Sequence, residues 1–494
     1  MRLHLSTAQS DRAAGALLGI AAGDALGAGY EFGPPLADDV DVQMAGGGSF
    51  GWAHGEWTDD TSMAVAIAEI SAEGLDLLTL EAQDWITARW IEWAADAADV
   101  GVQTRQVLAA AARGTGGVAT RVRSAASALH ERTGRTAGNG SLMRTAPVAL
   151  AYLDDGDEQT LVDAAHALSS LTHADPEAGE ACGLWCLAIR HAVREGTFDG
   201  LRLAVAQLPA DRRDVWTDRL DVAERQPPSS FTRNGWVVEA LQGAWSAISR
   251  TPVPSEDDEA GFPADHLRLS LEAAVRGGRD TDTVAAIAGS LLGARWGASA
   301  VPSAWRRVLH GWPGLRGRDL VRLGILTANG GRPDREGWPS DPMFDYTGFE
   351  SSALARHPDD DHVWLAGVGA LDALPADVDA VVSLCRLGAD QAPAEGVKPE
   401  NHVEVWLIDS ADPAKNPHLR YVLHDAVDAV EALRAQGRTV LLHCVQAQSR
   451  TPTVAALYGA RLTGRPAAES LRPVLRVLPR AHPNAAFRAE LERR

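Results

Sequence analysis

Trp57-Thr58-Asp59-Asp60-Thr61 is an acidic, hydroxyl-rich stretch with a counterpart far along the chain, Arg279-Asp280-Thr281-Asp282-Thr283. Each stretch comes directly before an apolar run with helical spacing, Met63 to Ile70 and Val284 to Leu292. Ser, Thr and Asp are preferred at helix starts, where they accept hydrogen bonds from unpaired backbone N–H groups. Capping therefore explains either stretch alone. It needs one such residue, however, and each stretch offers four.

Carboxylates crowded this closely repel one another unless a cation lies among them. The available ligands are all oxygens, because neither stretch contains Cys or His. Oxygen ligands suit a hard ion such as Mg²⁺, or Mn²⁺. We therefore expect the two stretches to meet in the folded chain and to hold Mg²⁺, as a pair of ions.

Length and charge narrow the classes of partner. A chain of 494 residues exceeds one ordinary core, so at least two domains are expected, and 45% hydrophobic with 23% charged residues is usual for a globular protein. The formal net charge of −20 disfavours nucleic acid or an anionic membrane as a bulk partner. An anionic substrate therefore needs a local cation, which bound metal would supply.

The four cysteines, Cys182, Cys186, Cys385 and Cys444, are too few in this length of chain for a disulfide framework. The N-terminus has no apolar signal-peptide stretch, and no uninterrupted apolar run approaches a membrane span. We expect a reduced, cytoplasmic protein. The sequence carries no signal for the number of subunits.

From residue 10 to about residue 325 the pattern is helical, and strand-like alternation is scarce. Glycine-rich segments at 46–48, 114–117 and 138–140 separate the apolar runs. We expect an all-α domain over 10–325. The predicted helices are Ala13–Leu26, Met63–Ser71, Leu80–Ala97, Leu161–Leu171, Pro176–Arg194, Trp236–Ser249, Leu267–Val275 and Val284–Trp296.

The character of the chain changes at 326–346, where the composition is that of a linker. Beyond it, short β-prone runs alternate with helical segments, which predicts an α/β domain with a mainly parallel sheet over 347–494. The fold class is therefore multi-domain. The predicted strands and helices are His362–Ala366, Val378–Leu384, His402–Ile408 and Thr439–His443, with Leu419–Gln436 and Pro452–Leu462.

Small residues recur at every fourth position from Gly15 to Gly27. Such a stripe predicts a tightly packed core helix that another backbone approaches closely. Asp24 lies inside this run and Glu31 lies just beyond it. Both are costly in a core unless they face a polar site.

Five pieces of sequence, spread in order over roughly residues 10–325, resemble the ADP-ribosylglycohydrolase family, which includes the enzyme that reactivates dinitrogenase reductase. The resemblance implies an all-helical fold, a binuclear Mg²⁺ centre, and an ADP-ribosylated protein or small molecule as substrate. The pieces are Gly23-Asp-Ala-Leu-Gly27 with Glu31, Trp57–Thr61, Gly138-Asn-Gly-Ser-Leu-Met-Arg144, Thr172-His-Ala-Asp175 and Asp280-Thr-Asp-Thr283.

The resemblance also implies roles for single residues. Glu31 corresponds to an acidic residue near the metals that assists catalysis or substrate entry. The loop Gly138-Asn139-Gly140-Ser141 and His173 correspond to the ADP-ribose cleft. Arg279 stands where a small residue is expected, and either contacts phosphate or covers the site. The implied metal ligands are Thr58, Asp59, Asp60, Asp280, Asp282 and Thr283.

Cleavage of a glycosidic bond at the ribose passes through an oxocarbenium-like state. Metals that grip the ribose hydroxyls and position a water supply orientation and Lewis acidity. One carboxylate, that of Asp59, Asp60 or Glu31, is expected to take the proton of this water. A histidine such as His173, considered alone, is more often a satisfied buried or capping residue.

A second motif, Leu441-Leu-His-Cys-Val-Gln-Ala-Gln-Ser-Arg-Thr451, lies between a β-prone run and a helical run. Loop N–H groups and a helix N-terminus at such a place form a nest for an anion and lower the pKa of a thiol. His443, Cys444, five intervening residues, Arg450 and Thr451 resemble the Cys-dependent protein phosphatases, notably the dual-specificity group. The resemblance covers about residues 361–494.

In this chemistry Cys444 attacks phosphorus while Arg450 holds the phosphate oxygens bidentately. The hydroxyl of Ser449 or of Thr451 steadies the thiolate when water releases it. His443 is expected to belong to the same phosphate-binding set.

An acid is also needed for the leaving group, and Asp409 is preferred, with Asp412 as the alternative. Ala447 stands where the phosphatase family usually has Gly. If the loop needs a positive φ there, Ala costs on the order of 1 kcal/mol and activity is weak or narrow.

We therefore expect two enzymes on one chain, an ADP-ribosyl hydrolase and a Cys phosphatase, acting on an ADP-ribosylated and a phosphorylated substrate. Their fusion favours one substrate that passes both sites. The rival interpretation is a sensor that binds ADP-ribose or a nucleotide without cleaving it, joined to a phosphate-binding module. The complete acidic set and the Cys–Arg pair speak against a sensor, and measuring product formation against simple binding discriminates the two.

Overall fold

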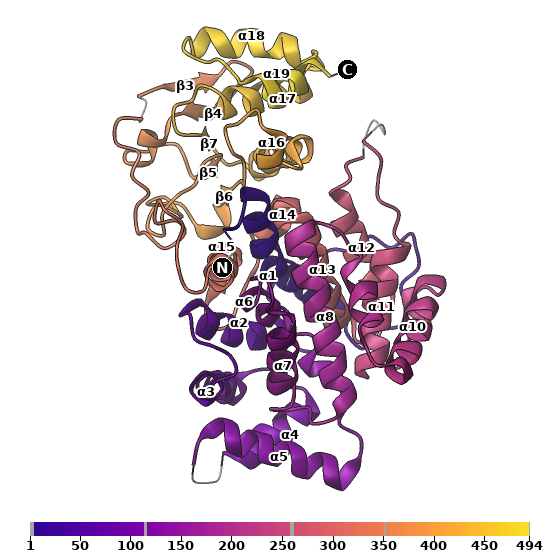
Figure 1. Ribbon diagram of the computed structural model, residues 1–494. Coiled ribbons are helices and arrows are strands. Elements are labelled where there is room, and N and C mark those ends of the chain that lie inside the picture. The colour runs from indigo at the N-terminus through magenta and orange to yellow at the C-terminus, as the bar shows by residue number, and fades with distance from the viewer. Residues whose placement is uncertain (1–3, 113–115, 257–260, 350–351, 494) are drawn as a thin grey trace. The chain divides into compact units, whose positions relative to one another are not determined.

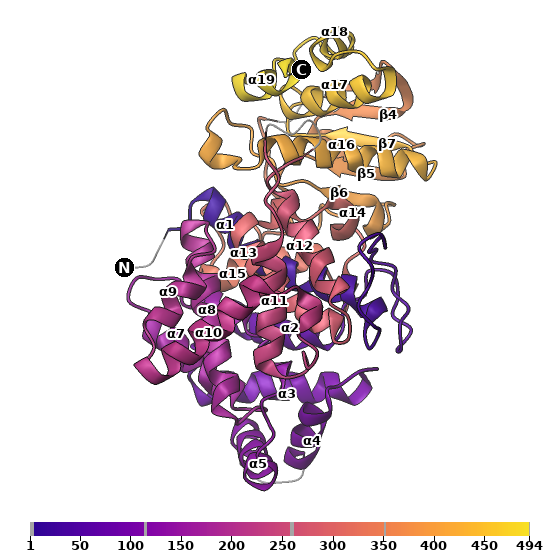
Figure 2. The same ribbon diagram turned by 90° about the vertical axis from the view of Figure 1, so that its right-hand side faces the viewer.

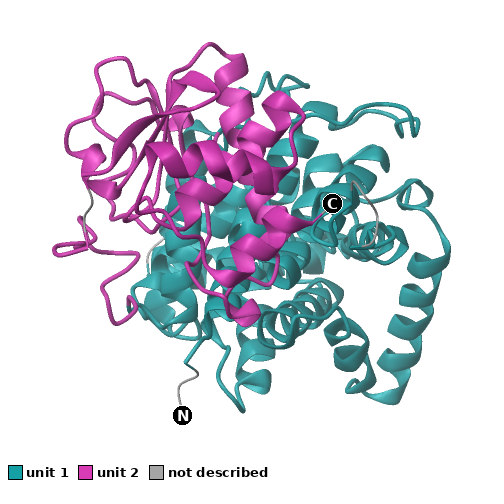
Figure 3. Ribbon diagram, turned by 90° about the horizontal axis from the view of Figure 1, so that it is seen from above, with its two compact units in different colours: residues 1–301, 308–332 teal, residues 302–307, 333–494 magenta. Residues whose placement is uncertain are grey.

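The computed structural model describes residues 4–112, 116–256, 261–349 and 352–493, and the predicted break at 114–117 lies partly outside them (Figure 1). The chain separates into two compact units, coloured differently in Figure 3. Unit 1 comprises residues 1–301 and 308–332, and unit 2 comprises residues 302–307 and 333–494. The domain bounds inferred from the sequence stay a prediction.

Unit 1 is mostly helical, and each of its eight predicted helices is present with ends that differ by a few residues. A two-stranded antiparallel ribbon, β1 (His310–Gly311) with β2 (Leu315–Arg316), accompanies them. The helices are α1 (Thr7–Gly27), α2 (Asp59–Ala72), α3 (Leu80–Asp96), α4 (Val102–Ala111), α5 (Val118–Thr133), α6 (Ala146–Ala151), α7 (Glu158–Ser169), α8 (Pro176–Glu195), α9 (Gly200–Ala206), α10 (Ala210–Arg225), α11 (Val237–Arg250), α12 (Asp265–Arg276), α13 (Thr281–Trp296) and α15 (Gly317–Ala328).

Helices α1 and α13 form the centre of unit 1, and glycines let their backbones touch (Figures 1 and 2). A Cβ atom added to Gly19 would lie 2.1 Å from the carbonyl oxygen of Gly289, and one added to Gly15 would lie 2.3 Å from that of Gly293. At Gly27, nearer the end of α1, the added atom would meet the backbone of α13 at 2.5 Å. The predicted close approach is therefore confirmed, and it brings the C-terminal end of α1 to the N-terminal end of α13.

Residues 7–30 form the one segment, among the described residues, that is long and apolar enough to cross a membrane by length and composition. An 18-residue window within it has a mean hydropathy of 1.2, and 89% of that window is buried inside the structure. A core helix that is apolar on all sides passes the same test.

Unit 2 contains a five-stranded sheet in the order β3-β4-β7-β5-β6. The β4–β7, β7–β5 and β5–β6 pairs are parallel, and the edge pair β3–β4 is antiparallel, so the sheet is mixed although mainly parallel (Figure 2). The elements are α14 (Ser303–Arg306), β3 (Leu354–His357), β4 (Asp360–Ala366), β5 (Ala380–Ser383), β6 (His402–Glu404), α16 (Leu419–Ala435), β7 (Val440–His443), α17 (Arg450–Thr463), α18 (Ala467–Val477) and α19 (Ala485–Glu492).

Strand β6 ends at Glu404, four residues before the predicted end. Past this point the side-chain amide of Asn416 pairs with the backbone of Ile408. It accepts from the N–H of Ile408 and donates to the carbonyl of Ile408, both at 2.9 Å. Local side-chain bonds of this kind compete with a β ladder.

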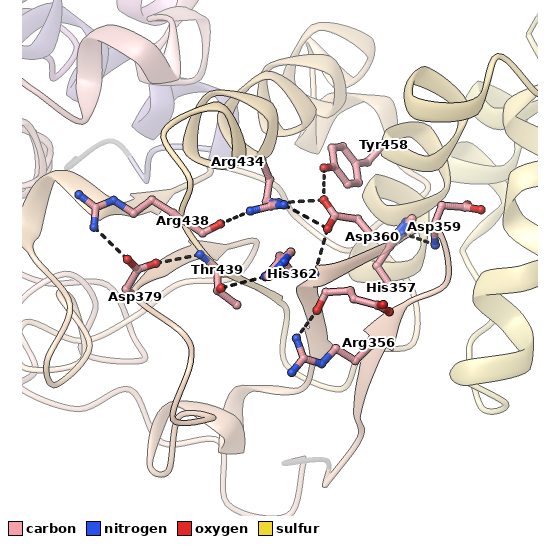
Figure 4. A network of polar contacts seen from close by, with 11 residues as sticks. Arg356, His357, Asp359, Asp360, His362, Asp379, Arg434, Arg438, Thr439 and Tyr458 are labelled. Carbon is pink, nitrogen blue, oxygen red and sulfur yellow. Dashed lines mark hydrogen bonds and ion pairs between the residues drawn. The ribbon is translucent and has the colours of Figure 1, made fainter.

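A polar network fastens the N-terminal ends of β4, β5 and β7 (Figure 4). Asp360 accepts from Arg434 at 2.8 Å and from the Tyr458 hydroxyl at 2.7 Å. Asp379 accepts from the Arg438 guanidinium at 2.9 Å and from the Thr439 N–H at 2.8 Å. Both carboxylates have cationic partners, so this network is structural, and it leaves the opposite strand ends for chemistry.

Candidate functional site

The starts of α2 and α13 meet in unit 1, so the predicted meeting of the two acidic stretches is confirmed. The hydroxyl oxygen of Thr58 lies 3.2 Å from a carboxylate oxygen of Asp60 and 3.4 Å from one of Asp282. A carboxylate oxygen of Asp59 lies 3.4 Å from the same hydroxyl. A hydroxyl has one proton and can satisfy only one of these acceptors, so three acidic side chains converge without enough donors.

Asp24, near the end of α1, holds the start of α2. Its carboxylate accepts from the backbone N–H groups of Thr58 at 2.9 Å and of Thr61 at 3.0 Å, and from the Thr61 hydroxyl at 2.6 Å. The side chain is fully buried. Asp24 thus faces a polar site, as the sequence indicated, but it is missing from the predicted ligand set.

Two groups of carboxylates have oxygens within 4.8 Å of one another. One group consists of Asp24, Asp60 and Asp282, and the other of Glu31, Asp280 and Asp282. Asp282 belongs to both, so the groups form one continuous acidic cluster. The Asp282 carboxylate is oriented locally, because one of its oxygens accepts from the backbone N–H of Thr283 at 2.9 Å.

Burial and mutual repulsion raise the pKa values of these carboxyl groups. Burial raises the pKa of Asp24 to about 6, although hydrogen bonds from Thr61 and Thr58 act in the opposite direction. Burial and then repulsion from Asp280 raise the pKa of Glu31 to about 9. Burial, then neighbouring carboxylates, raise the pKa values of Asp60 and Asp282 well above the usual range. The same direction holds for Asp59, Asp280 and Asp99.

The cluster fits a hard divalent cation. One oxygen of Asp60 and one of Glu31 are buried without a hydrogen-bond partner among the described residues. An anionic oxygen in that position is costly unless a cation occupies the same space. The donors are carboxylates and hydroxyls, which magnesium and manganese prefer.

The loop Gly138-Asn139-Gly140-Ser141 is tied to this cluster. The Asn139 amide donates to the carboxylate of Asp280 at 2.7 Å and to the carbonyl of Asn234 at 2.9 Å. Asn234 in turn donates to the Gly278 carbonyl at 3.0 Å, just before the second acidic stretch. Ser141 at the other end of the loop is buried and accepts from the Ser169 hydroxyl at 2.9 Å.

His173 lies against the same loop, and the donors around it fix its protonation. The buried Arg144 guanidinium, which can only donate, gives a 2.7 Å bond to the Thr172 hydroxyl. That hydroxyl has no other acceptor among the described residues, so it donates to Nδ1 of His173, also at 2.7 Å. The proton of His173 therefore sits on Nε2, 3.2 Å from where a Cβ of Gly138 or of Gly140 would be. Burial and Arg144 lower the pKa of His173 to about 3, which keeps it neutral.

Arg279 has a φ of 67°, which explains why a small residue is expected at this position. It pairs with Phe32, whose φ is 63°, through a 2.6 Å bond from the Phe32 N–H to the Arg279 carbonyl. The Arg279 N–H donates to the carbonyl of Gly33 at 2.8 Å. Its guanidinium donates to the Gly277 carbonyl at 3.4 Å.

The Cys444 loop of unit 2 runs from the end of β7 to the start of α17, as predicted. The Cys444 side chain is 2% exposed. One guanidinium nitrogen of Arg450 donates to the carbonyls of Leu384 at 2.7 Å and of Leu407 at 3.1 Å. Nε of Arg450 and the hydroxyl of Thr451 are buried without a hydrogen-bond partner among the described residues.

A chain of hydrogen bonds sets the proton on His443, immediately before Cys444. The N–H of Ala394 donates to Nδ1 of His402 at 2.9 Å, so the proton of His402 is on Nε2 and is donated to the Ser383 hydroxyl at 2.8 Å. Ser383 then donates to Nε2 of His443 at 2.6 Å. The remaining proton of His443 is therefore on Nδ1, which is buried and has the backbone of Cys444 as its neighbour. Burial lowers the pKa of His443 to about 4.

The two candidate acids of unit 2 differ in position. Asp409 accepts from the Ser449 hydroxyl at 2.7 Å and from Asn484 at 3.0 Å, and it lies 3.9 Å from Nε of Arg450. Asp412 instead caps a short turn by accepting from the N–H of Ala414 at 3.0 Å. The geometry therefore places Asp409, and not Asp412, at the Cys444 loop.

Ala447 in that loop has a φ of 55°. This is the conformation that glycine adopts without strain, so the cost expected for Ala at this position applies.

Several neighbours of the two sites were not among the predicted residues. Asp24 had a signal, an acid inside a glycine-spaced helix, and Arg144 ends one of the five motif pieces without having been given a role. Asp99 and Asn234 carry no signal that composition or spacing reveals. The partners of His443, namely Ser383 and His402, come from separate strands and follow only from the sheet register.

Comparison with known proteins matches residues 5–332 to the ADP-ribosylglycohydrolase family. The ADP-ribosylarginine hydrolase Tri1 of Serratia proteamaculans (strain 568) is 29% identical over 303 residues, covering 60% of this chain and 74% of the relative. The ADP-ribosyl-(dinitrogen reductase) glycohydrolase of Rhodospirillum rubrum is 29% identical over 309 residues, covering 60% and 89%. A shorter match of 88 residues, at 31% identity, covers 18% of this chain and 42% of dual specificity protein phosphatase 1 of Arabidopsis thaliana. The chain belongs to the ADP-ribosylglycohydrolase family.

Proposed function

We propose that unit 1 hydrolyses the bond between ADP-ribose and an acceptor, and that it needs Mg²⁺, for which Mn²⁺ substitutes. The observation that carries the proposal is the convergence of two distant acidic stretches, with unpartnered buried oxygens on Asp60 and Glu31. Relatives named as an ADP-ribosylarginine hydrolase and as a dinitrogen reductase glycohydrolase support the removal of ADP-ribose.

A bound pair of ions would supply Lewis acidity and orient the ribose hydroxyls. The side chains that would hold it are those of Thr58, Asp59, Asp60, Asp280, Asp282 and Thr283, with Asp24 added from the geometry of the cluster.

Side chains of the protein bind the ADP-ribose and accept the proton of the attacking water. The glycine-rich loop 138–141 leaves room for the ligand, and the Nε2–H of His173 donates to an oxygen of the ADP-ribose. A carboxylate, that of Glu31, Asp59 or Asp60, accepts a proton from water as the water oxygen bonds to the anomeric carbon. The acceptor leaves with the electron pair of the broken bond and takes up a proton.

The test is release of ADP-ribose, followed by HPLC, from arginine-, serine- and small-molecule-linked substrates with Mg²⁺ or with EDTA. Asp282→Asn is expected to abolish release, because Asp282 belongs to both carboxylate groups. Asp214→Asn, at an exposed acid on α10, is the matched control and should keep full activity. Undiminished release in EDTA would contradict the metal requirement, and binding without release would favour the sensor.

We also propose that unit 2 is a Cys-dependent phosphatase. The observation behind this is that Arg450 Nε and the Thr451 hydroxyl, both at one loop, are buried without a hydrogen-bond partner among the described residues, and that Nε has only the Asp409 carboxylate, 3.9 Å away, beside it. Buried donors of this kind are satisfied by an anion with several oxygens, such as a phosphate ester.

In this proposal the Cys444 thiolate bonds to phosphorus as the ester oxygen leaves with its electron pair and takes a proton from Asp409. Water then attacks phosphorus, the sulfur leaves as thiolate, and inorganic phosphate is released. The hydroxyl of Ser449 or Thr451 stabilises that thiolate.

Turnover of p-nitrophenyl phosphate tests the assignment. Cys444→Ser should abolish it, and Asp409→Asn should lower it far more than Asp412→Asn, because Asp412 is engaged in a turn. Equal losses in the two Asp variants would remove Asp409 from the role of acid. Feeding the product of each unit to the other tests whether one substrate passes both sites.

A further inference from the structure

The acid proposed for unit 2, Asp409, is held by a residue that lies far from it in the sequence. One carboxylate oxygen of Asp409, Oδ1, accepts from the Ser449 hydroxyl at 2.7 Å and from the side-chain amide of Asn484 at 3.0 Å. Asn484 is 75 positions further along the chain, immediately before α19. Two side chains therefore converge on a single oxygen of the acid.

These two hydrogen bonds determine which oxygen of Asp409 carries a transferable proton. Both donors bind Oδ1, so a proton on the acid lies on the other oxygen, Oδ2. Oδ2 is also the oxygen beside Arg450, 3.9 Å from its Nε, and the Asp409 side chain is 37% exposed, so a substrate can reach it. The arrangement directs the acidic proton towards the position proposed for the phosphate.

Ser449 stands at the N-cap position of α17, yet its hydroxyl is turned to the acid. A serine at this position ordinarily accepts a hydrogen bond from an N–H of the first helical turn. Within the described residues its side chain makes no such bond to α17. The hydroxyl accepts from the backbone N–H of Asn484 at 3.2 Å instead and gives its single proton to Asp409. The backbone of Asn484 therefore orients Ser449 as well.

Asn484 is itself fixed at both ends. Its side-chain carbonyl accepts from the N–H of Phe487 at 3.1 Å and so caps the start of α19. Two residues earlier, the N–H of His482 donates to the carbonyl of Gln448, next to Ser449, at 2.7 Å. With the carbonyl engaged at α19, the amide nitrogen of Asn484 can only face the acid.

We propose that Asn484 is a positioning residue for the acid of unit 2, which it holds directly and through Ser449, so that Oδ2 of Asp409 faces the leaving oxygen of the phosphate ester. The inference rests on the proposed phosphatase function of unit 2. As the bond from the Cys444 sulfur to phosphorus forms, the bond from phosphorus to the ester oxygen breaks. The ester oxygen keeps the electron pair and takes the proton from Oδ2. A misplaced acid therefore matters most for a leaving group that is too basic to depart as an anion.

The experiment measures kcat/KM of the full-length protein for phenyl phosphate and for p-nitrophenyl phosphate. Phenol resembles a tyrosine side chain, whose pKa is about 10, so its departure needs the proton. Nitrophenolate spreads its charge over the nitro group and needs the proton less. Asn484→Ser should lower kcat/KM about tenfold for phenyl phosphate and only about twofold for p-nitrophenyl phosphate. The inhibition constant of inorganic phosphate should not change, because inorganic phosphate has no ester group to release.

Two comparisons separate positioning from a structural role. Asn484→Ser keeps an N-cap for α19 and loses the amide donor, whereas Asn484→Ala loses both. The two variants should therefore share the kinetic defect, and only Asn484→Ala should lower Tm. In an Asp409→Asn background, Asn484→Ser should cause no further loss, because an effect that acts through Asp409 disappears with it.

Equal losses for the two esters in Asn484→Ser would overturn the proposal, and so would a further loss in the Asp409→Asn background. A defect confined to Asn484→Ala would assign the residue to helix capping alone. Each of these results leaves the phosphatase function standing. The absence of any turnover that depends on Cys444 would overturn both.

Discussion

Replacing Gly19 with Ala tests the contact on which the cluster in unit 1 depends. The new Cβ would lie 2.1 Å from the carbonyl oxygen of Gly289 and 2.9 Å from its carbon. Unbonded atoms of this kind rest at about 3.5 Å, so α1 and α13 would have to separate by about 1 Å. They cannot bend apart locally, because Gly15 and Gly23 make equally close contacts one turn away on each side.

The magnitude follows from two opposing terms. Gly→Ala inside a helix stabilises by about 1 kcal/mol when there is room for the methyl group. Overpacking costs about 1–3 kcal/mol, and a backbone obstacle puts this site at the upper end. Gly19→Ala should therefore lower the free energy of unfolding by about 2 kcal/mol. The matched control is Gly183→Ala in α8, where the added Cβ meets only side-chain atoms at 3.5 Å, so a gain of about 1 kcal/mol is expected.

Calorimetry of the full chain measures both variants. For a unit of this size about 2 kcal/mol corresponds to a Tm lower by about 4 °C, and the control should move upward. Gly19→Ala should also weaken Mg²⁺ binding, because separating the helices moves Asp24 away from Asp282. A Tm at or above that of the wild type in Gly19→Ala would refute the close-contact reasoning.

Three further predictions concern the sites. Ala447→Gly should raise the stability of unit 2 towards urea by about 1 kcal/mol, because it relieves the positive φ; an unchanged midpoint would count against strain there. In protein treated with EDTA, the pKa of Asp24 is raised to about 6 and that of Glu31 to about 9. The folding stability that these two groups contribute is therefore complete below pH 4 and is lost as pH rises through those values. The Tm difference between Mg²⁺ and EDTA should therefore be larger at pH 8.5 than at pH 5, and equal differences would be inconsistent with this linkage. Thr172→Val should weaken ADP-ribose binding about tenfold by calorimetric titration, since His173 loses the donor that fixes its proton, while Thr172→Ser should bind normally; similar affinities for both would exclude the relay.

Local chemistry in the sequence predicts much of unit 1. The four-residue spacing of Gly15 to Gly27 indicates close helix contact, and the acids after Trp57 and Arg279 indicate a shared site. What the sequence does not reveal is long-range partnership. Nothing near Asp24 shows that its carboxylate accepts from Thr58 and Thr61, because that depends on how α1 lies against α2.

In unit 2, too, local features could be predicted from the sequence and long-range contacts could not. The strand–loop–helix order around Cys444 can be read from the sequence, because the short apolar β-prone run before it and the helical run after it are local signals. The antiparallel edge strand β3 and the early end of β6 were not predicted, since the first is short and the second is decided by Asn416. The positive φ of Phe32 was also missed, because an aromatic residue is not expected in that conformation.

The pairing of α1 with α13 bears on how the chain emerges from the ribosome. The Thr281 hydroxyl donates to the carbonyl of Gly27, 254 positions earlier in the chain. Helix α1 is therefore translated long before α13, which contacts it and lies near the end of unit 1. In that interval the face of α1 that α13 later covers stays exposed, even though α2, α6 and α8 are already present, and exposed apolar surface of this kind favours binding by chaperones. A stalled or prematurely terminated product that lacks α13 would be unable to bury this face of α1.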